Sequence, residues 1–181
     1  VVDDITGTAK IAINPDINCH VDACMGGVTL AYLARLGEKI APWNLQVPGV
    51  SSISVDLHKF GYTSKGASVI MYASKHLRSF QGFVTDDWLG GFYGSSVVLG
   101  TKSGGSMASA WAVMHFLGDD GYLRLTRQAR EATLQLATNI RNTTELVVRA
   151  EPDSTLLCFG AKDRAALNVF TVADELSKRG W

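Results

Sequence analysis

The sequence lacks net charge, because its 17 Lys and Arg side chains balance its 17 Asp and Glu side chains. A neutral chain offers no electrostatic reason to bind nucleic acid or an anionic membrane surface. It also lacks any apolar run near the ~18–20 residues that a membrane-spanning helix needs, and no signal peptide is recognisable. We therefore expect a cytoplasmic protein, and the sequence leaves open a membrane anchor before Val1.

Cysteine is scarce as well. Cys19, Cys24 and Cys158 are an odd number of thiols without the spacing of a zinc site. This pattern indicates reduced thiols in a cytosol-like compartment rather than a disulfide framework, and we expect Cys19 and Cys24 to be packing residues. Asp86 and Asp87 stand next to each other without any further metal-ligand pattern, so no metal site is predicted.

The chain does contain enough apolar sequence for a hydrophobic core, since 46% of its 181 residues are hydrophobic. Its first half predicts alternating helices and strands. Helical spacing of apolar residues predicts helices at 4–13 and 28–36, the latter ending at Gly37, and short apolar or alternating runs predict strands at 18–23, 51–56 and 67–73. The last two strands should form a hairpin with residues 57–66 at its tip.

The second half predicts a different organisation. Residues 82–106 are rich in Gly and Ser but too apolar and aromatic for a disordered linker, so we expect an ordered loop that contacts another surface. A nearly all-apolar helix at 106–118 should be buried. An amphipathic helix at 119–143 follows it, and its apolar face is expected to contain Leu123, Ala129, Ala132, Leu136 and Ile140. The remaining pattern predicts strands at 145–150 and 154–161 and a helix at 166–180.

The hairpin tip carries the first candidate for catalysis, Lys59. A lysine at a strand end beside Leu57, Phe60 and Gly61 would be poorly solvated. Partial burial would lower the pKa of Lys59 and leave a nucleophilic amine. Taken alone, however, the local sequence favours the alternative of a surface lysine in a turn.

Asp22 favours the catalytic interpretation of Lys59 over that of a surface lysine. It ends the apolar strand "HVDA", where a free carboxylate is costly and should pair with a cation. The protonated ring nitrogen of pyridoxal phosphate is such a cation, and Lys59 would hold the aldehyde carbon of the same cofactor. Ala23, Gly26 and Gly27 are small enough for a flat ring to lie close to the backbone. The alternative for Asp22 is a helix N-cap.

Three motifs together resemble the pyridoxal-phosphate group II decarboxylase family: "HVDACMGG", "SSISVDLHKFGYTSKGAS" and "DWLGGFYGSSVVLGTKSGG". Their combination is most similar to the branch of lyases that act on phosphorylated sphingoid bases. The resemblance implies an α/β fold of fold-type I, with a mainly parallel seven-stranded sheet in a large domain and a small C-terminal α/β domain. Residues 1–118 would belong to the large cofactor-binding domain, and residues 119–181 would form the connecting helix and the start of the small domain.

The resemblance also assigns roles at the strand ends. Lys59 matches the lysine that forms the Schiff base with pyridoxal 5'-phosphate, and Asp22 matches the carboxylate that pairs with the pyridine nitrogen. Ala23 matches the residue packed under the ring. His58 matches a residue that contacts the cofactor phosphate.

Two further matches extend the site. Lys65 matches a second lysine important for activity, and Thr101 falls where the family has a serine that reaches the cofactor phosphate of the partner subunit, which implies a homodimer with composite active sites. The sequence departs from the family at Phe60, where tyrosine is common, and at Lys102, which lacks the bidentate fork of arginine. The family's ring-stacking histidine and phosphate loop would lie before Val1, so we expect a fragment that holds part of an active site.

The remaining histidines are weaker candidates. His20 precedes Asp22 by two residues, so both could point to one face of the sheet, and we expect packing or a supporting role for His20. His76 and His115 lie in apolar surroundings and are expected to be structural.

The resemblance implies a carbon–carbon lyase that cleaves a phosphorylated, lipid-like sphingoid base by retro-aldol chemistry. The products would be a long-chain aldehyde and phosphoethanolamine. Two alternatives stay open, a group II amino-acid decarboxylase and a non-catalytic paralogue. The product, aldehyde or carbon dioxide, separates the first two, and cofactor absorbance tests the third.

Overall fold

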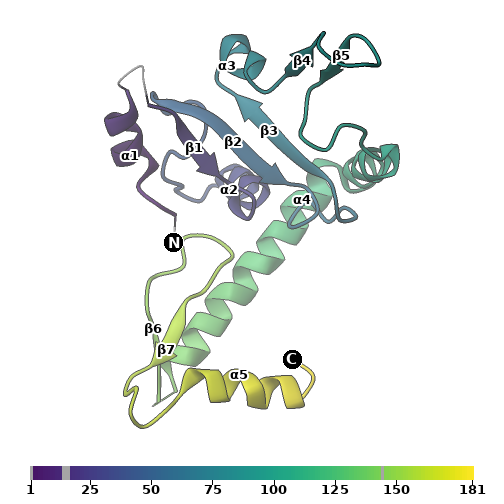
Figure 1. Ribbon diagram of the computed structural model, residues 1–181. Helices are drawn as coiled ribbons and strands as arrows, with labels where there is room; N and C mark the ends of the chain where they lie inside the picture. The colour runs from purple at the N-terminus through teal and green to yellow at the C-terminus, as the bar shows by residue number, and fades with distance from the viewer. Residues whose placement is uncertain (1, 14–16, 144) are drawn as a thin grey trace.

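The upper part of the molecule is built on a three-stranded sheet. The computed structural model describes residues 2–13, 17–143 and 145–181 (Figure 1). The strands lie in the order β1 (Cys19–Asp22), β2 (Val50–Asp56) and β3 (Ser68–Tyr72). β1 and β2 are parallel, whereas β2 and β3 are antiparallel and form the predicted hairpin. The carboxyl ends of β1 and β2 therefore meet at one edge of the sheet, where the hairpin loop begins.

The sheet has one apolar and one polar face, since side chains alternate along each strand. Val21, Ile53 and Val55 point into the core. There they join the buried alanines of α1 (Ile5–Ala12), which lies beside β1 in Figure 1. Burial of this face fixes the strand register, because a shift by one residue would turn these apolar side chains to the polar face.

Helix α2 (Gly26–Arg35) packs closely on the apolar face because of a glycine. A Cβ atom added at Gly27 would lie 2.6 Å from a methyl carbon of Val55, so a larger residue would push the helix away from β2. The helix ends as predicted. Gly37 follows it with a φ of 90°, which glycine adopts without strain.

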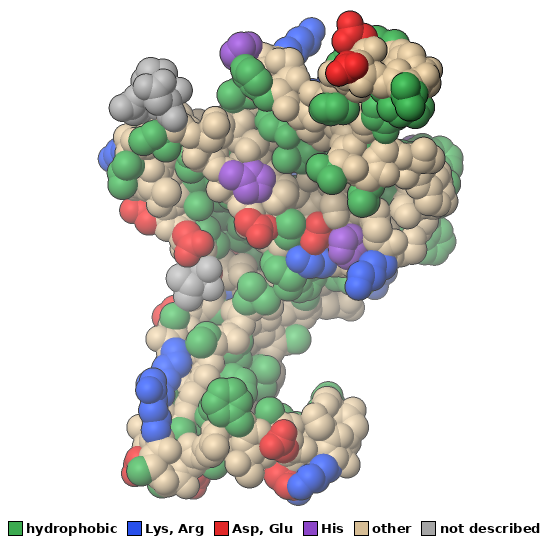
Figure 2. All heavy atoms as spheres, viewed as in Figure 1, with side chains coloured by type: hydrophobic (Ala, Val, Ile, Leu, Met, Phe, Trp, Pro, Cys, Tyr) green, Lys and Arg blue, Asp and Glu red, His purple; other side chains and the backbone are tan. Residues whose placement is uncertain are grey.

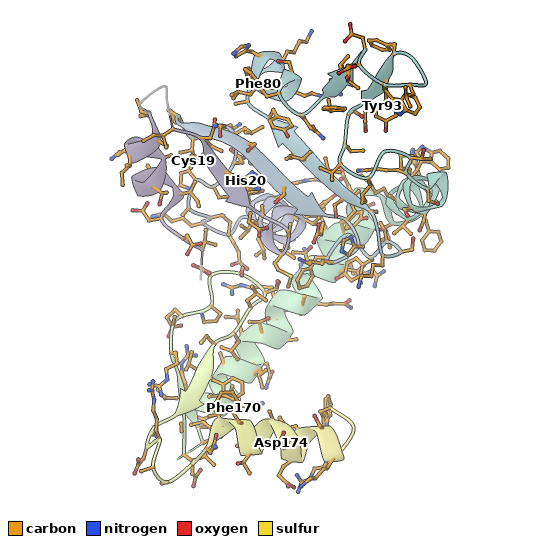
Figure 3. All side chains as sticks on the ribbon, viewed as in Figure 1. Cys19, His20, Phe80, Tyr93, Phe170 and Asp174 are labelled. Atoms are coloured by element: carbon orange, nitrogen blue, oxygen red, sulfur yellow. The ribbon has the colours of Figure 1, made fainter. Side chains whose placement is uncertain are left out.

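The opposite face of the sheet carries polar side chains in register. His20 pairs with Ser52, and Asp22 pairs with Ser54. The ring nitrogens of His20 lie 2.8 Å from Ser52 Oγ and 3.1 Å from Ser54 Oγ, and Figure 3 shows this ring on the sheet. His20 and Asp22 therefore share one face, as their spacing predicts, and His20 links β1 to β2.

The segment after the sheet contains α3 (Lys75–Ser79), β4 (Phe83–Thr85) and β5 (Tyr93–Ser95). β4 and β5 pair in an antiparallel hairpin, so the predicted ordered loop holds regular structure. Asp86 and Asp87 lie in the connection between these strands. Helix α3 was not predicted, because its five residues are too few to show a helical spacing of apolar side chains.

The long helix α4 (Gly104–Arg141) bends at Gly118, whose φ of 56° and ψ of −173° are not helical. The bend falls where the sequence predicts that one helix ends and the next begins. The prediction that the first helix is buried is wrong for this chain, because Trp111 and Phe116 are 66% and 88% exposed. An all-apolar helix needs a partner surface, but its sequence does not say which segment supplies that surface.

The second half of α4 is amphipathic, as predicted, but its buried stripe differs from the expected one. Leu136 is half exposed. Small side chains dominate the stripe because α4 packs closely against α2 and β6 (Leu146–Val148). The buried residues are Tyr122, Thr126, Thr133, Ala137 and Ile140.

The lower part of the molecule consists of the hairpin of β6 with β7 (Phe159–Ala161) and of α5 (Val169–Lys178), which extends from it in Figure 1. These elements appear in the predicted order after the long helix. No helix in the described part of the chain combines the length and apolar character that crossing a bilayer requires.

Arg130 connects the two parts of the molecule. Its guanidinium donates to the carbonyl oxygens of Pro152 and Ser154 at 2.7 and 2.8 Å, and it pairs with Glu38 after α2 at 2.9 Å. These contacts explain why β7 is shorter than the predicted strand at 154–161. The carbonyl of Ser154 accepts from Arg130 rather than from a neighbouring strand.

Candidate active site

Acidic, basic and histidine side chains gather at the carboxyl ends of β1 and β2 (Figure 2). Asp22 is the last residue of β1, and Asp56 is the last residue of β2. The hairpin loop then turns back, since the N–H of Lys59 donates to the carbonyl of Asp56 at 3.3 Å. Two parallel strands thus bring two carboxylates and one amine from separate segments to a single edge.

The loop that carries Lys59 is fixed to the rest of the molecule. The buried hydroxyl of Tyr122 in α4 donates to the carbonyl of Gly61 at 2.9 Å. Tyr62 next to it has a φ of 59°, in the left-handed region that is costly for a residue with a side chain. Contacts with α4 therefore hold a turn that the loop would not adopt by itself.

Asp22 lies on the exposed face of β1, so the prediction that its carboxylate sits in an apolar environment is wrong. The alternation of the strand buries Val21 instead. Hydrogen bonds from the side chain and the backbone N–H of Cys24, the latter at 3.0 Å, hold the pKa of Asp22 below its usual value. The helix-cap alternative is not observed either, because Met25 is the N-cap residue of α2. Asp22 is thus an anion that faces outward at neutral pH.

Lys59 also differs from its sequence-based expectation. Its side chain is 36% exposed, and its Nζ lies 2.8 Å from Oδ2 of Asp56. The hydrogen bond to Asp56 raises the pKa of Lys59, whereas burial among Leu57 and Phe60 was expected to lower it. Partial burial does lower the pKa of Lys59, but the hydrogen bond to Asp56 outweighs this effect.

Asp56 is the functional candidate that the sequence analysis missed. Its Oδ1 accepts a hydrogen bond from Ser68 Oγ at 2.6 Å, and its Oδ2 faces Lys59. The hydrogen bond with Lys59, followed by that with Ser68, lowers the pKa of Asp56 to about 2. The only signal in the sequence is an acid three residues before a lysine at a strand end, and the direction of the turn decides whether their side chains meet.

Cys24 belongs to this polar group rather than to the core. Its Sγ lies 3.4 Å from Ser54 Oγ, and burial followed by a hydrogen bond with Asp22 raises the pKa of the thiol. The prediction of a packing role is therefore wrong for Cys24, which follows the strand end where alternation stops. It is confirmed for Cys19, which is buried, and both thiols are free.

His58 is held by the returning strand. Its Nδ1 donates to the carbonyl of Ala67 at 2.8 Å, and its Nε2 lies 3.7 Å from Oδ2 of Asp56. The ring thus stands beside the carboxylate that also faces Lys59. A contact between His58 and a cofactor phosphate stays a prediction.

Thr101 lines a cavity of about 650 Å³ between the hairpin and the start of α4. Lys102 and Ser103 line it from the same segment, and Gly66 and Ser68 line it from the hairpin. Hydroxyls, an ammonium group and a helix N-terminus suit an anion such as a phosphate.

Lys65 is exposed in the same hairpin loop as Lys59 and immediately precedes Gly66 of this cavity. His76 and His115 lie on α3 and α4, away from the strand ends. Their rings contact aromatic side chains, with centroid distances of 5.0 Å to Phe80 and 4.3 Å to Trp111. Both histidines are exposed, as are these aromatic partners, so their structural roles stay a prediction.

A family model described as "Pyridoxal-dependent decarboxylase conserved domain" matches residues 2–162. The chain belongs to this family. It is 39% identical to the sphingosine-1-phosphate lyase of Arabidopsis thaliana over 181 residues. This alignment covers the whole chain and 33% of that lyase. The chain thus spans about a third of the length of the curated relatives that it matches.

Solved structures agree with the family assignment. The sphingosine-1-phosphate lyase of Burkholderia pseudomallei superposes with a TM-score of 0.90 at 36% identity, over the whole chain and 40% of that protein. A glutamate decarboxylase of Lactobacillus brevis gives a TM-score of 0.80 at 17% identity, over 99% of the chain and 42% of that protein, which shows a shared fold. The chain is a mixed α/β part of the fold-type I architecture, as the resemblance implies.

Family membership identifies pyridoxal 5'-phosphate as the cofactor. The residues at the strand ends fit it chemically, because Asp22 offers an outward-facing anion and Lys59 an accessible amine. Ala23 directly follows β1 and is buried, and its N–H donates to the carbonyl of Ser54 in β2 at 2.9 Å. The packing of Ala23 under the cofactor ring stays a prediction.

Proposed function

We propose that the full-length protein containing this chain is a pyridoxal-phosphate-dependent carbon–carbon lyase. Its substrate is a phosphorylated sphingoid base, and its products are a long-chain aldehyde and phosphoethanolamine. One observation carries this proposal. Asp22 and Lys59 converge at the ends of two adjacent parallel strands, in a chain that resembles sphingosine-1-phosphate lyases along its whole length.

Asp22 and Lys59 have complementary tasks. Nζ of Lys59 is the nucleophile that holds the aldehyde carbon of the cofactor, and the carboxylate of Asp22 pairs with the ring nitrogen. The low pKa of Asp22 keeps this carboxylate charged, so that it favours a protonated ring nitrogen. When bound, the cofactor supplies a sink for the electrons of the broken bond.

The cavity at Thr101 is the proposed place for a phosphate group. Thr101 and Ser103 would donate hydroxyl hydrogen bonds, and Lys102 would supply a positive charge. His58 does not line this cavity, but its Nδ1 lies 3.5 Å from Oγ of Ser68, which does. By the resemblance, Thr101 serves the cofactor of the partner subunit in a homodimer. Exposed aromatic side chains in the segment that precedes Thr101, such as Trp88 and Phe92, support an interface with a second copy.

The reaction needs proton transfers that residues of the chain could perform. The bond between C2 and C3 of the substrate breaks, the C3 hydroxyl loses its proton as the aldehyde forms, and C2 gains a proton. Lys65 is our candidate for one of these transfers, because it follows Lys59 in the same loop and is exposed.

Product analysis tests this function. The full-length protein with added cofactor should convert a phosphorylated sphingoid base to equal amounts of aldehyde and phosphoethanolamine, measured by mass spectrometry. The Lys59→Ala variant should form neither product. Release of carbon dioxide from amino acids without aldehyde formation would show a decarboxylase instead, and failure to develop cofactor absorbance would show a non-catalytic protein.

A further inference from the structure

The ion pair between Lys59 and Asp56 is rigid at its acidic end. Asp56 is in register with Ser68 on the neighbouring strand, and Ser68 Oγ donates to Asp56 Oδ1 at 2.6 Å. The Asp56 side chain is only 14% exposed. The sheet thus fixes one oxygen and leaves Oδ2 to receive Nζ of Lys59 at 2.8 Å.

The other groups around Lys59 do not all act in the same direction. Asp22, at the end of β1, also favours the positive charge of Lys59, whereas partial burial of the amine opposes it. Nε2 of His58 lies farther from the same carboxylate oxygen, at 3.7 Å. The charged form of Lys59 is therefore the preferred one in this environment, and Asp56 contributes most to that preference.

This preference conflicts with the task of Lys59. Capture of an aldehyde forms a carbon–nitrogen double bond at Nζ and releases one water molecule. Nζ must first lose a proton to the solvent and leave Asp56, because an ammonium group has no lone pair with which to attack. Every approach of the amine to a carbonyl carbon therefore begins with the loss of this ion pair.

We propose that Asp56 is a positioning residue that holds Nζ of Lys59 as an ammonium ion whenever this amine carries no carbonyl compound. This inference rests on the proposed role of Lys59 as the cofactor lysine. Asp56 slows capture of the cofactor by the empty protein. It also withdraws the amine released when substrate takes its place, so that Lys59 does not compete with the substrate amine.

Competitive labelling of amines tests the ion pair without any cofactor. The cofactor-free full-length protein is treated with trace acetic anhydride at a series of pH values, and labelling of each lysine is measured by peptide mass spectrometry. In Asp56→Asn, labelling of Lys59 should begin at lower pH and increase about two- to fivefold at pH 8, as expected for the loss of one ion pair. Borohydride trapping with pyridoxal phosphate should accelerate in parallel.

Two variants control this experiment. Asp56→Glu keeps the charge and should retain the labelling profile of the unchanged protein, which a merely structural effect of position 56 would not predict. Glu175→Gln removes a comparable pair, in which Lys178 Nζ lies 2.6 Å from Glu175, and should change labelling of Lys178 without changing that of Lys59.

The outcomes separate this inference from the proposed function. An unchanged Lys59 profile in Asp56→Asn would overturn the inference, even if pyridoxal phosphate attaches to Lys59. A shifted profile combined with attachment of the cofactor to another lysine would confirm the ion pair between Asp56 and Lys59. It would overturn the role of Lys59 as the cofactor lysine, and with it the role of Asp56 in cofactor capture.

Discussion

Two carboxylates at the strand ends have different tasks because they have different partners. Asp56 is turned toward Lys59 and Ser68, so its charge is already paired within the chain. Asp22 receives hydrogen bonds from Cys24, which stabilise its charge without neutralising it. Asp22 is therefore the carboxylate that can bind a cation of the cofactor, whereas Asp56 binds the ammonium group of Lys59.

Replacing Asp22 by Asn should separate binding from chemistry. Asn has nearly the same size and can still accept from the N–H of Cys24, so the fold should be retained. Without a negative charge the ring nitrogen loses its proton, and the rate should fall by orders of magnitude. Turnover measured alongside circular dichroism checks this, and near-normal turnover in a folded variant would refute the role of Asp22.

Lys65 should act after the cofactor is bound. It lies six residues beyond Lys59 in the same loop and is exposed, so Lys65→Ala should leave the attachment of the cofactor intact. The variant should keep the visible absorbance of the bound cofactor and lose turnover. If the absorbance disappears as well, Lys65 instead holds the cofactor or the loop.

At the scale of elements, the sequence predicts the helices and strands that depend on the local spacing of apolar and polar residues. The strands of the main sheet, α1, α2 and the bend at Gly118 follow from apolar periodicity and glycine. The ion pair of Asp56 with Lys59 and the exposed first half of α4 do not follow from it. The first depends on the direction in which a turn sends a side chain, and the second depends on which segment covers an apolar helix.

The contact of α2 with β2 should depend on Gly27. In Gly27→Ala the added methyl group would lie 2.6 Å from Val55, and relief requires the helix to shift from the sheet that positions Asp22. We expect a loss of about 1–3 kcal/mol in the free energy of unfolding, measured with denaturant. Gly104→Ala is a matched control, since its Cβ would meet open space. Equal stability of the two variants would contradict this close approach.

At the scale of the whole molecule, two features concern how larger parts meet. The bend at Gly118 lies at the predicted boundary between residues 1–118 and 119–181, and we propose that it separates the two domains. Arg130 then joins them, because it contacts Glu38 on one side and the loop at Pro152 on the other. Such a long-range tie could not be predicted from the sequence, in which Arg130 is one of several arginines on an amphipathic helix.

The position of Thr101 allows two arrangements of the active site, in which it serves either its own chain or the neighbouring subunit. Within one chain it shares a cavity with Ser68 and Gly66, so it could serve its own site. The proposed composite site instead requires it to serve the neighbouring subunit. A mixture of two inactive variants distinguishes these arrangements, since Lys59→Ala damages the amine and Thr101→Glu repels a phosphate.

If Thr101 acts across the interface, each mixed dimer has one site with both intact residues. Random exchange of subunits should then restore roughly one quarter of the active sites of the unchanged protein. If Thr101 serves its own chain, both sites of every mixed dimer remain damaged and no activity returns. Subunit exchange is verified with differently tagged copies, so that inactivity of a fully exchanged mixture counts against the composite site.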